Sequence, residues 1–101
     1  MKVTRVQYTV REGYAEQNRK NIGGVMSELR ALNRKDVTYA VYLLDDGKTF
    51  MHLAHQDTVE AERFPTSLES FKRFQAELKE NLEVPPKVET FGLLESSAPL
   101  F

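Results

Sequence analysis

The sequence predicts an α+β domain in which two amphipathic helices cover one face of a four-stranded antiparallel sheet. An Asp-Gly step at positions 46–47 separates two strand-like runs, and this arrangement is typical of a β-hairpin. Two segments with apolar residues at helical spacing flank the hairpin, and a further strand-like run lies beside each of them. The resulting order is strand, helix, strand, strand, helix, strand.

The composition limits the classes of partner. The chain has 101 residues, enough for the single domain, residues 1–101, that we expect. A formal net charge of -1 provides no field that would attract nucleic acid or an acidic membrane surface. The chain contains no Cys, which excludes disulfides and thiolate metal sites. No apolar run approaches the ~20 residues that span a bilayer. We therefore expect a cytoplasmic protein without nucleic-acid or membrane partners.

The first strand and the first helix are predicted for residues 2–11 and 14–32. β-branched and aromatic residues fill the strand, and one of its faces carries Val6, Tyr8 and Val10. Apolar residues recur at helical spacing in the helix, at Ala15, Ile22, Val25, Met26, Leu29 and Leu32. Gly23 and Gly24 inside this helix each cost up to about 1 kcal/mol relative to Ala. They indicate close approach of another backbone, a bend or a weak point, and we favour close approach.

The hairpin within residues 37–57 has a register that its turn determines. With Asp46 and Gly47 as the central turn residues, the opposed pairs on one face are Leu43/Phe50, Val41/His52 and Tyr39/Ala54. Both faces of the hairpin are mostly apolar. A hairpin with water on one side would alternate between apolar and polar residues, so this hairpin is predicted to be covered on both sides.

The second half of the chain is predicted to hold a short helix, a longer helix and a last strand. Asp57-Thr58-Val59-Glu60 has the N-cap and the N3 acid of a capping box, and Pro65 would end the short helix. Thr66 or Ser67 can cap the longer helix, whose apolar stripe is Leu68, Phe71, Phe74, Leu78 and Leu82. Val84-Pro85-Pro86 cannot continue a helix, so Lys87–Leu94 is predicted to be the last strand.

This order predicts the ferredoxin-like βαββαβ fold, an antiparallel sheet with both helices on one face. Right-handed crossovers place the first and third strands in the centre. The other face is left bare in a monomer, and an apolar face of this kind is usually buried. We therefore expect a two-fold homodimer joined sheet to sheet, with Pro99-Leu100-Phe101 packed on the partner or on the subunit's own helix.

Four stretches of the chain resemble the dimeric α/β-barrel superfamily, and most of all its small antibiotic-biosynthesis-monooxygenase-like proteins. These stretches are YTVREGYAEQN, YAVYLLDDGKTFMHLAHQD, SLESFKRFQAELK and VPPKVETFGLLESS. They span nearly the whole chain and consist mainly of fold-bearing positions, so the resemblance implies a dimeric α/β barrel. Members of this superfamily include cofactor-free oxygenases of aromatic polyketides, haem-degrading enzymes that use a Trp, and small proteins with no established role. This chain has no Trp, so the haem-degrading group fits it poorly.

The candidate site is predicted in the space between the sheet and its dimer partner. If Met51 and Leu53 face the helices, the alternate residues of the hairpin face that space. Arg5 and Gln7 on the first strand would point the same way. The predicted catalytic residue is His52, and the predicted substrate-binding residues are Gln7, Arg5, Tyr39, Phe50 and Val41. A mostly apolar cavity with a few converging polar groups is the usual form of a small-molecule site.

The two histidines are assigned different surroundings. His52 could act as a general base or hydrogen-bond a phenolic or enolic substrate, because imidazole changes protonation near neutral pH. Its structural alternative is a hydrogen bond to Gln7 or to an interface carbonyl. His55 falls on the other face of the strand, so we predict no metal site.

The remaining polar candidates also have structural alternatives. Arg5 could hold an acidic ligand or form an ion pair with Glu89 or Glu95. The hydroxyls of Tyr39 and Tyr8 could orient a ligand, although aromatic strand residues more often fill a core.

Two functions remain open. The first is a cofactor-independent, monooxygenase-like enzyme that acts on a small hydrophobic or aromatic molecule. The second is a non-catalytic, dimeric protein that binds a small ligand or serves as an accessory. A pocket of roughly several hundred Å3 with converging polar groups would favour an enzyme or a ligand-binding protein, and a filled interface would favour a structural role.

Overall fold

The computed structural model describes residues 1–64 and 66–101. Its strands are β1 (Lys2–Val10), β2 (Val37–Leu43), β3 (Thr49–Gln56) and β4 (Leu82–Gly92), and its helices are α1 (Ala15–Leu32) and α2 (Glu69–Lys79). Single 3-10 turns at Glu12–Tyr14 and Ala61–Arg63 precede the two helices. The predicted order of elements is confirmed. Pro65, which was predicted to end the short helix, lies outside the described residues.

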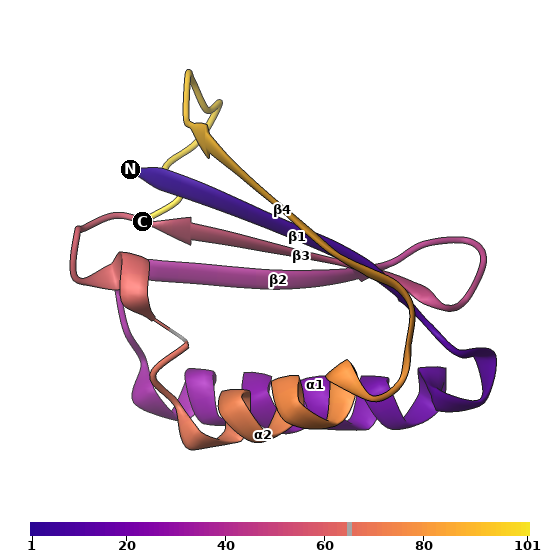
Figure 1. Ribbon diagram of the computed structural model, residues 1–101. Coiled ribbons are helices and arrows are strands. Elements are labelled where there is room, and N and C mark those ends of the chain that lie inside the picture. The colour runs from indigo at the N-terminus through magenta and orange to yellow at the C-terminus, as the bar shows by residue number, and fades with distance from the viewer. Residues whose placement is uncertain (65) are drawn as a thin grey trace.

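The four strands form one antiparallel sheet in the order β2-β3-β1-β4, so the first and third strands lie in the centre as predicted. Both helices run along the same face of this sheet (Figure 1). The core between the layers consists of Tyr8, Val10, Tyr14, Val25, Phe50, Phe71, Phe74 and Leu78. This arrangement is the ferredoxin-like α+β fold.

The hairpin pairs β2 with β3 in the predicted register, with Val41 opposite His52 and Leu43 opposite Phe50. Its turn is longer than predicted. The Gly47 N–H donates to the Leu44 carbonyl, so Asp45 is also a central turn residue and Gly47 follows with a φ of 74°. Glycine adopts this left-handed conformation without the steric cost that a side chain imposes.

The prediction of which hairpin face meets the helices was wrong. In the pairing of β1 with β3, Tyr8 lies opposite Phe50 and Val6 lies opposite His52. Opposed residues of antiparallel strands project from the same face, and Tyr8 belongs to the core under the helices. His52 therefore faces the helices, whereas Arg5 and Gln7 project from the bare face of the sheet.

The bounds of the last two elements differ from the prediction. Helix α2 begins at Glu69, and its N-cap residue, Leu68, provides no side-chain cap. The Thr66 hydroxyl donates to the Arg63 carbonyl and does not cap the helix. Strand β4 begins at Leu82 and contains the Pro85-Pro86 pair. Proline is tolerated there because β4 is an edge strand, and the β1–β4 register shifts beside these prolines, between Gln7 and Thr9.

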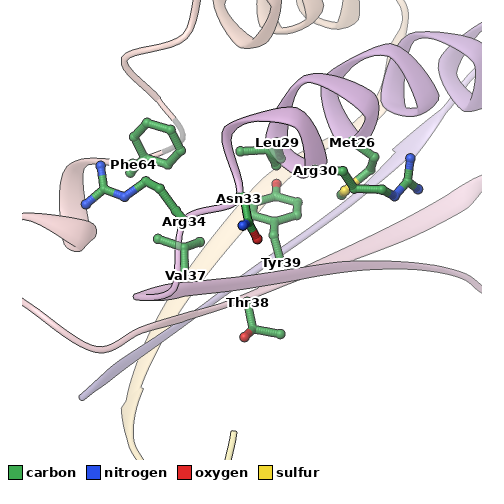
Figure 2. A pocket seen from close by; sticks show the side chains of 9 residues that line it. All are labelled: Met26, Leu29, Arg30, Asn33, Arg34, Val37, Thr38, Tyr39 and Phe64. Atoms are coloured by element: carbon green, nitrogen blue, oxygen red, sulfur yellow. The ribbon is translucent and has the colours of Figure 1, made fainter. Parts of the chain in front are cut away.

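The C-terminal tail lies on the sheet rather than on a helix. After Gly92, which pairs with Lys2 on β1, the tail reaches β2, where the Thr38 hydroxyl donates to the Leu100 carbonyl at 3.3 Å. Thr38 points away from the helices, opposite to Tyr39 (Figure 2). The tail therefore covers one end of the bare face. Of its two predicted positions, the subunit's own helix is wrong, and packing on a partner stays a prediction. The rest of this face keeps exposed apolar residues such as Tyr42 and Phe91.

The two glycines inside α1 do not mark a close approach to another backbone. A Cβ atom built on Gly23 or Gly24 meets nothing within 4 Å. The helix therefore bears the conformational cost of glycine without gaining a contact. We expect Gly23→Ala and Gly24→Ala each to raise the free energy of unfolding by about 0.5–1 kcal/mol. Urea denaturation at neutral pH measures this, and a destabilised variant would contradict the open surroundings.

Candidate functional site

An apolar cavity lies between the sheet and α2, and we refer to it as the inner cavity. It has a volume of about 360 Å3. Its apolar walls come from β1, α2 and β4: Val6, Phe71, Phe74, Leu78, Leu82, Pro86 and Val88. Tyr8, Tyr39 and His52 line it from the sheet, and Gln75 and Lys79 line it from α2. A mostly apolar cavity with a few converging polar groups is the usual form of a small-molecule site.

His52 lies at the centre of a hydrogen-bonded cluster that connects three strands and a helix. Its Nε2 atom lies 2.7 Å from the Tyr8 hydroxyl, and its Nδ1 atom lies 2.6 Å from the Tyr39 hydroxyl. The side-chain amide of Asn18 on α1 donates to the Tyr8 hydroxyl at 3.0 Å. The imidazole also packs 5.7 Å from the ring of Phe74, measured between centroids. This cluster is almost dry, because His52 is 5% exposed and Tyr8 is 2% exposed.

Burial keeps all three titratable members of this cluster uncharged. It lowers the pKa of His52 from 6.5 to about 4, since an imidazolium loses its hydration here. Burial also raises the pKa of Tyr8, partly offset by the hydrogen bond from Asn18, and it raises the pKa of Tyr39. At neutral pH the inner cavity therefore presents hydrogen-bonding groups without a formal charge from the sheet.

A second cavity, of about 510 Å3, opens between the end of α1 and β2, and we refer to it as the edge cavity (Figure 2). Arg34 at its rim binds Asp36 through two hydrogen bonds and lies 4.4 Å above the ring of Phe64. This pairing lowers the pKa of Asp36 to about 2. Tyr39 lines both cavities and stands between them. Its neighbours in the edge cavity include Leu29 of α1 (Figure 2).

The structure brings together only some of the predicted site residues. His52 and Tyr39 both line the inner cavity, and their side chains are hydrogen-bonded to each other. Phe50 and Val41 share their face of the sheet but lie beside α1, where they line a separate hollow with Ile22 and Met26. They form no wall of the inner cavity.

Arg5 and Gln7 lie on the bare face of the sheet and cannot reach the inner cavity. The Arg5 guanidinium forms an ion pair with Glu89 at 2.9 Å, which confirms the structural alternative for this residue. It also donates to the side-chain carbonyl of Gln7 at 2.5 Å and contacts the Met51 sulfur at 3.1 Å. The predicted structural partner of His52 was Gln7 or an interface carbonyl, and the hydroxyls of Tyr8 and Tyr39 take that place instead.

Sequence reasoning missed Asn18 as a member of the site. Asn18 occupies a position on the apolar stripe of α1, four residues before Ile22 and seven before Val25, and it is fully buried. A lone amide in an apolar helical stripe needs a buried hydrogen-bond partner. That position was therefore a usable signal for a polar group on the facing sheet.

Known structures share the architecture of this chain. A crystal structure named as an antibiotic biosynthesis monooxygenase matches it with a TM-score of 0.81, at 10% sequence identity, over 94% of this chain and 100% of that one. This chain therefore shares the ferredoxin-like α+β fold of that structure. A Mycobacterium tuberculosis protein matches with a TM-score of 0.80 at 14% identity, over 96% of this chain and 98% of that one.

A Nitrosomonas europaea protein, provisionally named an antibiotic biosynthesis monooxygenase, has the same fold. Its TM-score is 0.80 at 15% identity, over 94% of this chain and 100% of that one. No protein-family model matches the sequence, and no curated protein matches it. The likeness therefore concerns the fold. Within residues 1–64 and 66–101, no helix is long and apolar enough to cross a membrane.

Proposed function

We propose that the inner cavity binds a small aromatic or enolisable molecule and that the protein oxidises this molecule with O2 without a bound cofactor. The observation that carries the proposal is the apolar cavity of about 360 Å3 with the His52 cluster in its wall. Two proteins of the same fold bear antibiotic biosynthesis monooxygenase names, which supports this reaction class. In such a reaction a substrate CH2 group becomes a carbonyl, and the second oxygen atom leaves as water with the two hydrogens.

The chemistry requires an electron-rich form of the substrate, because an enolate or a phenolate gives an electron to O2 far more readily than the protonated keto or phenol form does. The inner cavity suits this requirement in two ways. Its apolar walls exclude water, which strengthens any hydrogen bond to a developing oxyanion. Its sheet side supplies the uncharged hydroxyl of Tyr39, which His52 holds in place through its Nδ1 atom.

The test is O2 consumption by the purified protein with a panel of anthrones and hydroxynaphthalenes, in the absence of added cofactor. We expect His52→Gln to lower kcat/KM by about 100-fold, the effect of disturbing one oxyanion donor. The matched control is His55→Gln, three positions along the same strand but on the bare face, and it should retain activity. If compounds of the panel bind to the wild-type protein but no O2 is consumed, the alternative of a non-catalytic ligand-binding protein is favoured.

A further inference from the structure

The hydrogen bonds around His52 have a direction that Asn18 determines. The Asn18 side-chain nitrogen donates to the Tyr8 oxygen, so that oxygen already accepts one hydrogen bond. A phenolic hydroxyl has one proton of its own to donate. Among the described residues, the acceptor beside the Tyr8 hydroxyl is His52 Nε2, at 2.7 Å. With the Asn18 amide in this orientation, the Tyr8 proton is directed at Nε2, which is then the unprotonated nitrogen of the ring.

The remaining steps of this chain follow from the chemistry of a neutral imidazole. A neutral ring carries a proton on one nitrogen only, so Nδ1 carries it when Nε2 accepts. The Nδ1–H group then donates to the Tyr39 oxygen at 2.6 Å. The Tyr39 hydroxyl accepts this bond and keeps its own proton, for which the described residues provide no acceptor. The chain thus runs from Asn18 through Tyr8 and His52 to Tyr39, each group donating to the next.

We propose that Tyr39 is the direct hydrogen-bond donor to the ligand of the inner cavity, and that the ligand is a planar apolar molecule presenting a carbonyl oxygen or the enolate oxygen formed from it. His52 is then a positioning residue, because both of its ring nitrogens are engaged by tyrosine hydroxyls. This proposal rests on the proposed function for the occupancy of the cavity. It involves hydrogen bonding and no proton transfer.

The uncharged state of the hydrogen-bonded side chains supports this choice of ligand class. Burial raises the pKa of Tyr39 and lowers that of His52, so neither group ionises at neutral pH to offer a charge. Hydrogen bonds in a chain of this kind polarise one another, so the terminal hydroxyl is a stronger donor than an isolated phenol. A ligand oxygen that gains negative charge benefits most from such a donor.

The direction of the chain can be measured without any ligand. Nitrogen-15 NMR of the imidazole ring at pH 7 distinguishes the two neutral tautomers. We expect His52 to carry its proton on Nδ1 in the wild-type protein, and His55→Gln simplifies the spectrum to one imidazole. A proton on Nε2 would overturn the proposal, because the Tyr39 proton would then be directed at His52 and its oxygen would face the ligand as an acceptor.

The ligand class can be tested with three bicyclic probes of similar size: 1-indanone, which accepts a hydrogen bond, indole, which donates one, and indene, which does neither. Their dissociation constants are compared between wild type and Tyr39→Phe, which removes the hydroxyl and keeps the ring. We expect the substitution to raise the dissociation constant of 1-indanone by about 5-fold, which corresponds to one net hydrogen bond. The dissociation constants of indole and indene should change by less than about 2-fold.

Each other outcome overturns a distinct part of the argument. Selectively weaker binding of indole would mean that the hydrogen bonds between Asn18 and Tyr39 run in the opposite direction. Equal effects on all three probes would make Tyr39 a packing residue, and circular dichroism of the variant shows whether the fold itself is intact. Failure of all three probes to bind the wild-type protein would overturn the ligand class and the proposed function together, while the tautomer of His52 still decides the direction.

Discussion

Acidification from pH 7 to pH 4.5 is expected to remove about 2 kcal/mol of the free energy of unfolding through His52 alone. The folded-state pKa of this imidazole is about 4, below its ordinary value of 6.5, because burial penalises the charged ring. Between these two values the unfolded chain binds a proton that the folded chain excludes. The contribution of His52 is therefore fully present above pH 6.5 and is lost as the pH falls toward 4.

Urea denaturation at pH 7, 6, 5 and 4.5 measures this loss. Carboxylates also titrate in the lower part of the range, so the comparison is with His52→Gln, which lacks the ionisable ring and should show a flatter dependence. His55→Gln, on the opposite face of the same strand, controls for the replacement of a histidine as such. Parallel curves for wild type and His52→Gln would mean that the ring titrates alike in the folded and unfolded chains.

Substitutions at two neighbouring positions of β2 are expected to have opposite consequences, because the side chains of Val41 and Tyr42 lie on opposite faces of the sheet. Val41→Asp places a carboxylate against the apolar core beneath α1 and should destabilise the fold by about 2 kcal/mol or more. Arg19 and Arg30 line the same hollow and offset only part of this cost. Tyr42→Asp replaces a side chain that is 50% exposed on the bare face, so the subunit should stay folded. Thermal unfolding followed by circular dichroism separates the two results.

The same pair of variants tests the homodimer that we propose for the bare face. Tyr42→Asp should convert a wild-type dimer into a folded monomer, because it places a carboxylate in an apolar interface. Sedimentation at micromolar concentration gives the masses. A wild-type mass of 11.6 kDa would contradict the homodimer. An unfolded Tyr42→Asp variant together with a stable Val41→Asp variant would reverse the assignment of the two sheet faces.

The sequence was sufficient to predict the order of the elements and the register of the hairpin, because both follow from local patterns. Which face of the hairpin lies against the helices depends on the pairing of β1 with β3, and this pairing joins residues about forty or more positions apart. Both faces of the hairpin are apolar, so its own pattern gives no direction, whereas Tyr8 opposite Phe50 resolves it. The predicted site was divided between two faces for this reason.

The site itself depended on contacts that no single segment reveals. His52 stood out because a histidine in an apolar strand needs polar partners, but those partners lie on β1 and β2 rather than at Gln7. The extension of β4 upstream through Pro85 and Pro86 was also hidden, because proline argues against a strand except at an edge. With that extension, Leu82 and Pro86 become walls of the inner cavity.

The central position of β1 has a consequence for synthesis on the ribosome. β1 is made first among the strands, yet one of its two neighbours is β4, the last, and Val3 pairs with Phe91. Until residues 82–92 have emerged, β1 is an edge strand with unpaired amide and carbonyl groups, open to pairing with another nascent chain. The inner cavity is also incomplete at that stage, because Val88 is still missing from its wall. A ligand of this cavity can therefore stabilise only the completed sheet, and chains truncated before β4 are expected to aggregate whether or not the ligand is present.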